Sequence, residues 1–399
     1  MIGIFSKVRS QVKIKHGKVH IDNPMFRLHY RFSFLLLCLC CLLSTSRQYF
    51  GEHIQCIQDS AGVPPKVLNN YCFIMSTFSV PKSYTGKIGE DIPYMGIGNP
   101  GKQQSHGRYG HNVFRASAQN ASDEGSDVIY HNYYQWVPFC LFLQAIMFYT
   151  PYFIWKRNDN NKVRTVIQGL NIYELEGQKR EKQEDVLAMY FLERLHIHVR
   201  WALSYFVCEL LCLVNVIGQM FFTNYFLGGT FLTYGVQVFE FLDQDAEVRA
   251  DPMAVVFPRV TKCTFHKFGS SGTIQRHDAM CVLALNVINE KIYVFLWFWF
   301  ILLGVLTAFH LIYRIATLSS YTVRKNVIKA KTGLGSREYL NMVVPRCDIA
   351  DWLLLSFLSK NMEVLAFNEF LERLAKKMVY GTKQESFSDE SDVKMPLTQ

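Results

Sequence analysis

Residues 292–313 read IYVFLWFWFILLGVLTAFHLIY, a run of 22 residues without Asp, Glu, Lys or Arg. A helix that crosses the hydrocarbon core of a bilayer needs roughly 20 predominantly apolar residues, so this run predicts a membrane span. Trp297, Trp299 and Tyr313 lie toward its ends, where aromatic side chains anchor spans at the interface. The whole chain agrees, because half of its 399 residues are hydrophobic and 15% are aromatic.

Three further apolar runs precede this one along the chain, at 32–46, 128–155 and 210–239. The first is the weakest: it is only 15 residues long, so a span there must include Leu28 to Tyr30 and let the nearby arginines snorkel. An alternative interpretation of this run is a secretory signal peptide, because a basic stretch, a short apolar run and small residues at 44–46 follow one another.

Charge is sorted between the segments that separate the runs. Segments 1–31, 156–200 and 314–399 hold 29 of the 42 Lys and Arg and a net charge of +11, whereas 47–127 and 240–291 have a net charge of −1. Basic residues concentrate on cytoplasmic loops, so both termini are predicted to be cytoplasmic. The overall charge of +9 is therefore a topology signal and does not indicate a nucleic-acid partner.

Four cysteines lie on the predicted outer side, two in each outer loop: Cys56, Cys72, Cys263 and Cys281. An even number of cysteines in an oxidising compartment favours disulfides, and four cysteines permit three pairings, between which these residues do not choose. The pattern Cys263-x2-His266 with His277-x3-Cys281 also has the ligand types of a zinc site. Disulfides account for all four thiols whereas zinc leaves two over, so we expect no metal.

The chain has none of the local motifs that support catalysis. It lacks a P-loop, a His-Glu-x-x-His pair and a Gly-x-Ser-x-Gly elbow, and the glycines at 96, 98 and 101 are interrupted by Pro100, with no strand before them. We therefore expect neither an enzyme nor a cofactor.

Glu209 is the one acidic residue inside a predicted span. A charge at that depth is costly, so we expect it to face a donor on another helix, the bundle interior or water.

Two further segments have local signals. Asn120-Ala-Ser122 is an N-glycosylation sequon within a long polar stretch of the first outer loop. Apolar residues recur at helical spacing from Asp348 to Lys377, which predicts a small cytoplasmic helical domain. The same periodicity over 184–200 predicts a helix that continues into the third span.

The sequence resembles the innexin family of invertebrate gap-junction proteins. The resemblance is strongest at Tyr133-Tyr134-Gln135-Trp136-Val137-Pro138-Phe139, where the second span begins. It extends to Phe257–Lys267 in the second outer loop and Asn289–Phe300 at the fourth span. Two cysteines in each outer loop also match innexins, whereas connexins carry three.

This resemblance implies a ring of subunits, eight in number, homomeric or with other innexin-like chains, around a wide pore. Rings in apposed cells would dock and pass ions and small metabolites. It further implies that the outer loops are stapled by Cys56–Cys281 and Cys72–Cys263, and that the N-terminal segment lines the pore with Met1, Ile2, Gly3 and Phe5. The alternatives are an undocked hemichannel, favoured by a glycan at Asn120, and an adhesion or scaffold protein with four spans.

We therefore expect an all-α membrane protein with four transmembrane helices, a disulfide-stapled extracellular cap and a helical cytoplasmic domain. Its expected parts are a cytoplasmic N-terminal segment at 1–27, spans at 28–46, 132–155, 201–227 and 291–314, extracellular loops at 47–131 and 228–290, a cytoplasmic loop at 156–200, a cytoplasmic helical domain at 315–380 and a disordered tail at 381–399.

Overall fold

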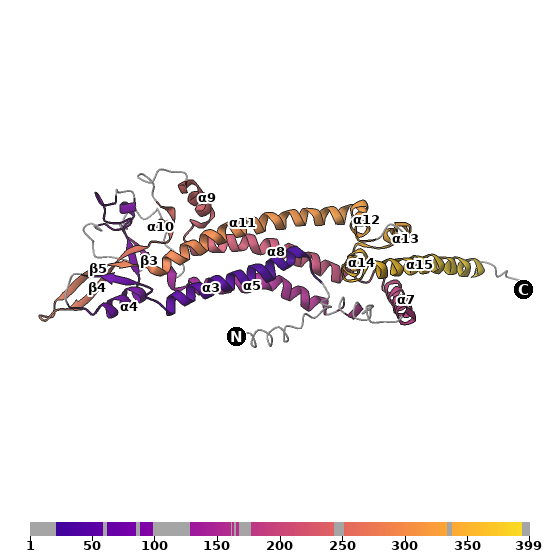
Figure 1. Cartoon of the computed structure of the whole chain (residues 1–399), viewed down its shortest axis with the longest axis horizontal. Helices are drawn as coiled ribbons and strands as arrows, with labels where there is room; N and C mark the ends of the chain where they lie inside the picture. The colour runs from indigo at the N-terminus through magenta and orange to yellow at the C-terminus, as the bar shows by residue number, and fades with distance from the viewer. Residues whose placement is uncertain are drawn as a thin grey trace, which may run out of the picture. The chain divides into compact units, whose positions relative to one another are not determined.

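The computed structural model describes residues 21–58, 62–84, 88–98, 128–160, 162, 165–166, 177–242, 251–332 and 337–392. Within them, four helical runs are long and apolar enough to cross a membrane: Pro24–Tyr49, Val137–Asp159 (α5), Val199–Phe226 (α8) and Ala284–Ser319 (α11) (Figure 1). The chain is thus a helical membrane protein with four spans, as the apolar runs predict. The pore-lining candidates Met1, Ile2, Gly3 and Phe5 and the sequon at Asn120 lie outside the described residues.

The first span is built from three helical pieces, α2 (Pro24–Arg27), a π-helical segment η1 (Leu28–Ser33) and α3 (Phe34–Tyr49). The Ser33 hydroxyl donates to the carbonyl of Leu28, at 3.1 Å, across the π-helical segment. Further along the first span, the Ser44 hydroxyl donates to the side-chain oxygen of Asn289 in α11, at 3.1 Å. The first span thus contacts the fourth through a buried polar pair.

Helix α11 has 36 residues and is about 54 Å long. The hydrocarbon core of a bilayer is about 30 Å thick, so the helix extends past the core. It includes the expected span at 291–314 and continues beyond it on both sides.

A five-stranded antiparallel sheet was not part of the sequence prediction, which named only helices and disulfides between the outer loops. Its strands run in the order β1-β5-β4-β2-β3, with the bounds β1 Gln55–Ile57, β2 Thr77–Ser79, β3 Ile129–His131, β4 Val260–Phe268 and β5 Ile274–Val282. Strands β4 and β5 form a hairpin paired from Val260↔Val282 to Phe268↔Ile274. We call β1–β5 together with helix α4 (Pro65–Met75) the cap.

Short helices complete the part that contains the cap. They are η2 (Pro81–Tyr84), η3 (Tyr133–Gln135), α9 (Phe231–Leu242) and α10 (Pro252–Val256). Asp251 caps α10, because its side chain accepts a hydrogen bond from the backbone N–H of Met253 at 2.9 Å.

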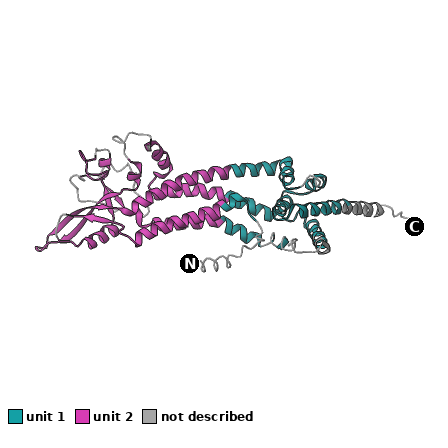
Figure 2. Cartoon of the chain, viewed as in Figure 1, with its two compact units in different colours: residues 1–27, 151–210, 309–399 teal, residues 28–150, 211–308 magenta. Residues whose placement is uncertain are grey.

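The chain divides into two compact units, residues 28–150 with 211–308, and residues 1–27 with 151–210 and 309–399 (Figure 2). The second unit contains α7 (Gly177–Glu193), α12 (Tyr321–Lys329), α13 (Arg337–Val343), η6 (Val344–Arg346), α14 (Ile349–Asn361) and α15 (Val364–Asp392). Helix α14 is buried along nearly its whole length and begins at a capping box of Asp348 and Asp351. Helix α15 extends to Asp392. Composition predicts a disordered tail from residue 381, and the helix continues past that point.

The predicted continuous helix from residue 184 into the third span is wrong. Helix α7 ends at Glu193 and α8 begins at Val199. Between them His196 has φ +65°, a left-handed conformation that an α-helix does not contain. The apolar periodicity is present on both sides of this break, so periodicity alone did not reveal it.

Candidate functional site

Two disulfides join the sequence-distant parts of the cap. Cys56 of β1 is bonded to Cys281 of β5, with 3.9 Å between their Cα atoms, and the two residues are also register partners in the sheet. Cys72 of α4 is bonded to Cys263 of β4, with Cα atoms 5.8 Å apart. Each bond therefore links the first predicted outer loop to the second, in the pairing that the family resemblance implies.

These bonds close very long loops. Their sequence separations are 225 and 191 residues, and a disulfide that closes a loop of 100 residues already removes unfolded-state entropy worth about 4.7 kcal/mol. Because Cys263 and Cys281 are both in disulfides, neither offers a thiolate to the zinc pattern that they form with His266 and His277.

The aromatic motif at 133–138 connects the cap to the start of α5. Tyr134 donates through its hydroxyl to the carbonyl of Phe73 at 3.3 Å, and the Gln135 amide donates to the same carbonyl at 2.5 Å. Phe73 lies next to Cys72 in α4, whose disulfide reaches the sheet. The motif thus fastens the amino end of a membrane helix to the disulfide-bonded cap.

The remaining residues of the motif pack around this junction. Tyr133 is fully buried, with its ring edge against Phe257 at a centroid distance of 5.7 Å. The ring centroids of Trp136 and Phe139 lie 5.8 Å apart. Pro138 lies in the first turn of α5, where a missing backbone N–H costs nothing, and its carbonyl accepts from the Cys41 thiol at 3.3 Å.

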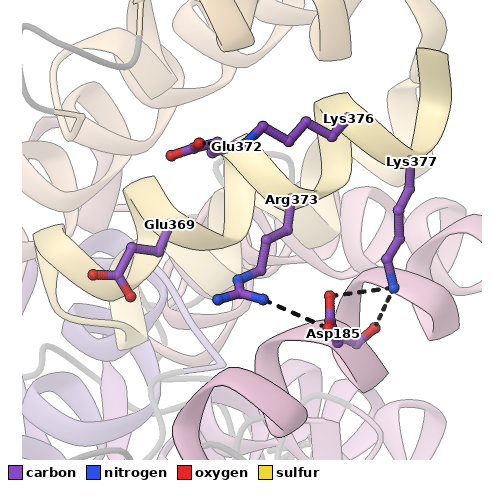
Figure 3. Close-up of a pocket in the computed structure, with 6 residues that line it drawn as sticks. All are labelled: Asp185, Glu369, Glu372, Arg373, Lys376 and Lys377. Atoms are coloured by element: carbon purple, nitrogen blue, oxygen red, sulfur yellow. Dashed lines mark hydrogen bonds and ion pairs between the residues drawn. The ribbon is translucent and has the colours of Figure 1, made fainter. Parts of the chain in front are cut away.

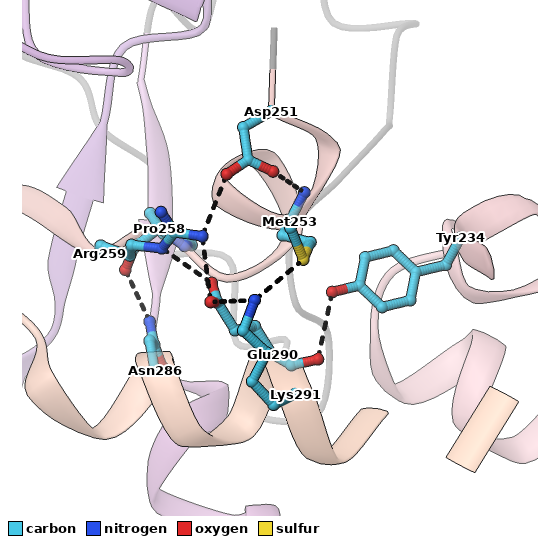
Figure 4. A network of polar contacts seen from close by, with 8 residues as sticks. All are labelled: Tyr234, Asp251, Met253, Pro258, Arg259, Asn286, Glu290 and Lys291. Atoms are coloured by element: carbon cyan, nitrogen blue, oxygen red, sulfur yellow. Dashed lines mark hydrogen bonds and ion pairs between the residues drawn. The ribbon is translucent and has the colours of Figure 1, made fainter. Parts of the chain in front are cut away.

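A charged cluster holds the segment before β4 to the start of α11 (Figure 4). The Arg259 guanidinium donates to both carboxylate oxygens of Glu290, at 2.9 and 3.0 Å, and to Asp251 at 3.0 Å. The Glu290 carboxylate is buried, and Lys291 also contacts it at 3.2 Å. Asn286 donates to the carbonyl of Pro258 at 2.8 Å, so side chains of α11 hold the segment before β4 at two neighbouring residues, Pro258 and Arg259.

His131 of β3 is a buried titratable group in the cap. Its Nε2 atom lies 2.7 Å from the Ser79 hydroxyl of β2. Burial lowers the pKa of His131 to about 4, because the interior disfavours the imidazolium. The cap therefore contains a neutral histidine at physiological pH.

Glu209 lies in a buried polar cluster in the other unit and is only 3% exposed. The Arg314 guanidinium donates to both of its oxygens, at 2.8 and 2.6 Å. The Asn23 amide donates to it at 2.7 Å, and His310 Nε2 lies 3.2 Å away. Three groups from two other segments thus satisfy the acid, with its charge balanced within the subunit.

The same cluster holds the segment that follows the expected pore-lining residues. Asn23 uses its amide N–H for Glu209 and accepts with its carbonyl oxygen from Lys360 of α14 at 2.6 Å. Trp155 of α5 donates to the backbone carbonyl of Ile21 at 3.0 Å. Residues 21–23 are therefore held by spans and by a helix of the predicted cytoplasmic domain.

His196, Asp348 and Asp351 form a group whose ligand atoms could hold a metal ion. The His196 Nδ1 atom lies 2.6 Å from Asp348 and 3.5 Å from Asp351. Both carboxylates already serve the capping box of α14, and Asp351 also accepts from the backbone N–H of His196. This use as a helix cap accounts for the group without a metal.

A hollow of about 360 Å³ lies between α7 and α15. Figure 3 shows Asp185 of α7 between Arg373 and Lys377 of α15, and its ion pairs with them measure 3.5 and 3.3 Å. Glu369, Glu372 and Lys376 complete the lining. Three acidic and three basic side chains leave no net charge, so the arrangement fits a helix contact better than a site for a charged ligand.

Sequence reasoning missed the partners of Glu209 and Glu290. Arg314 follows directly after the last apolar residue of the fourth run, a position typical of an arginine at the membrane interface. Asn23 is uncharged, so its sequence gives no sign that it pairs with an acid. Arg259 and Glu290 are 31 residues apart in a region with charges of both signs. A weak signal was available for Arg314 alone, because an acid within a span calls for a basic partner at a similar depth.

Known proteins are similar to this chain over nearly all of its length. The sequence model of the Innexin family matches residues 22–378 of this chain. Innexin inx2 of Drosophila melanogaster is 42% identical over 379 residues, which cover 95% of this chain and 96% of that protein. Innexin shaking-B of the same species is 40% identical over 95% of both chains, and innexin inx2 of Schistocerca americana is 41% identical over 95% of this chain and 98% of its own length.

Proposed function

The chain belongs to the innexin family of gap-junction channel proteins, and from this premise we propose that eight of its subunits form a ring with both termini in the cytoplasm. Such subunits assemble with other innexins into channels that pass ions and small metabolites between adjacent cells. The excess of Lys and Arg in three segments supports the orientation.

We propose that the cap is extracellular and docks with the cap of a ring in the apposed cell. The observation that carries this proposal is the pair of disulfides, Cys56–Cys281 and Cys72–Cys263, which join the two loops between spans into one sheet. Docking two rings requires surfaces that keep their shape, and disulfides persist in the oxidising space outside the cell.

We propose that Met1, Ile2, Gly3 and Phe5 line the pore mouth. The anchoring of residues 21–23 by Glu209, Lys360 and Trp155 supports this proposal, since it gives the preceding segment a defined point of attachment.

The experiment that tests the channel function is current and dye transfer between two cells that both express the protein. We expect coupling between such pairs and none when one cell lacks the protein. Adhesion between the cells without transfer would refute the channel.

An undocked hemichannel is the second candidate function, and the sequon at Asn120 in the long first loop favours it. A glycan there would obstruct two rings that meet head to head. Asn120→Gln removes the sequon: coupling that rises in this variant supports obstruction, whereas unchanged coupling removes the argument. Dye uptake by single cells without transfer between pairs would favour the hemichannel.

A further inference from the structure

Helix α12 (Tyr321–Lys329) follows directly after the last membrane helix. Helix α11 ends at Ser319, and the charge-free run within it ends before Arg314. Five residues of helix from Arg314 to Ser319 correspond to about 8 Å. The headgroup layer of a bilayer adds about 5–8 Å beyond the hydrocarbon core on each side, so α11 ends near the outer edge of that layer and α12, which begins two residues later at Tyr321, starts beside the lipid headgroups.

The segment around α12 carries positive charge without acidic residues to balance it. The sequence has no Asp or Glu between Glu290 and Glu338. From residue 315 to 337 it has five basic residues: Arg324, Lys325, Lys329, Lys331 and Arg337. A protein surface that faced only water would gain from mixing both signs of charge.

One face of α12 is attached to the rest of its unit. The Arg324 guanidinium donates to the carbonyl of Leu318 near the end of α11, at 3.0 Å, and the backbone carbonyl of Arg324 accepts from the Trp352 indole of α14, also at 3.0 Å. Ile328 is fully buried. These contacts give α12 a fixed orientation with Arg324 and Ile328 on the inner side.

The other face presents Lys325 and Lys329, which are four residues apart and therefore neighbours on the helix surface. Lys329 is exposed and Lys325 is partly exposed. Within the part of the chain that the structure describes, neither ammonium group has an acidic partner. Two like charges at this spacing destabilise a helix slightly, and an anionic partner would reverse the sign of that interaction.

Lys331 extends the positive potential toward the interior of the unit. Burial lowers the pKa of Lys331. Burial first, and then the charges of Lys331 and Arg314, lower the pKa of Lys360 to about 8. The charges of Glu209 and Asp22 oppose this shift of Lys360, whereas the segment 315–337 itself contains no acidic residue.

We propose that α12 binds the anionic headgroups of the adjacent lipid leaflet, with Lys325 and Lys329 contacting lipid phosphate and carboxylate oxygens. Basic clusters just beyond a membrane helix attract anionic lipids in this way. The inference rests on the proposed orientation, because anionic lipids are concentrated in the cytoplasmic leaflet.

Hydrogen–deuterium exchange of the full-length protein in lipid nanodiscs tests this proposal. The discs contain either phosphatidylcholine alone or phosphatidylcholine with phosphatidylserine. We expect the backbone amides of α12 to exchange about fivefold more slowly for each lysine engaged when phosphatidylserine is present. Lys325→Gln with Lys329→Gln should abolish this difference, and Lys325→Arg with Lys329→Arg should retain it.

Lys376→Gln with Lys377→Gln is the matched control, since it removes the same charge from lysines that have acidic partners on α15 and α7. This variant should keep the slow exchange. Equal exchange in the two kinds of disc, or slow exchange that survives Lys325→Gln with Lys329→Gln, would overturn the proposal. Inorganic phosphate added to phosphatidylcholine discs separates the sources: equal slowing there would assign the site to free phosphate and overturn the assignment to lipid.

The measurement needs one bilayer and no docked ring. A failure of the channel function, seen as absent coupling between paired cells, is therefore distinct from a failure of lipid binding.

Discussion

Removal of the Arg314 guanidinium should leave Glu209 as a buried acid without its main counter-charge. In Arg314→Met two of the four hydrogen-bonding contacts to Glu209 are lost, while those from Asn23 and His310 remain. Breaking a buried ion pair by removing one partner costs about 3–5 kcal/mol. Because Asn23 and His310 remain, we expect a cost at the lower end of this range, about 3 kcal/mol, which corresponds to a fall of about 4 °C in Tm for a chain of 399 residues.

The assay is thermal unfolding of the purified protein in neutral detergent, followed by size-exclusion chromatography with fluorescence detection. Arg346→Met is the matched control, because Arg346 is exposed, and such a substitution changes stability by no more than about 0.5 kcal/mol. The double variant Glu209→Gln with Arg314→Met should recover most of the loss, since it removes the uncompensated charge together with its partner.

Two results would refute this reasoning. One is an Arg314→Met variant as stable as Arg346→Met. The other is a double variant whose loss equals the sum of the two single losses, because independent sites are additive and a coupled pair is not.

Three further predictions concern the cap and the spans near it. Cys56→Ser should abolish surface assembly, because it opens a bond across 225 residues, and currents of wild-type size from that variant would contradict the stapled cap. His131 has a pKa of about 4 in the folded protein, below its unfolded value of about 6.5. Its contribution of about 3 kcal/mol to the free energy of unfolding is therefore present above pH 6.5 and is lost as pH falls toward 4. In His131→Gln, a plot of Tm against pH should lack this acid-dependent fall. An added Cβ at Gly235 would overlap the Trp297 ring, whereas one at Gly218 meets nothing within 4 Å, so Gly235→Ala should cost about 1–3 kcal/mol and Gly218→Ala should not lower Tm.

The four spans could be predicted because their signal is local. A charge-free apolar run such as 292–313 has no stable place except a bilayer or a large core, and its length selects the bilayer. The helical region after residue 348 was predicted for the same reason, since apolar residues at helical spacing describe the α14 and α15 faces without reference to other segments.

Three of the five strands in the cap had no comparable signal. Strands β1, β2 and β3 have three residues each, which is too short for an alternating pattern to stand out from a loop. The break between α7 and α8 was missed because one residue in a left-handed conformation, His196, ends a helix without changing the periodicity on either side.

The sequence by itself determined the number of spans, the expected sidedness of the chain and the presence of four cysteines in the loops between spans, because each depends on composition within a short stretch. Only the tertiary structure decided which residues meet. Cys56 and Cys281 become register partners across 225 residues, and Asn23, Glu209, Arg314 and Lys360 come together from four segments. Such meetings depend on how helices and strands pack after they form, and several pairings satisfy the same local chemistry equally well until packing selects one.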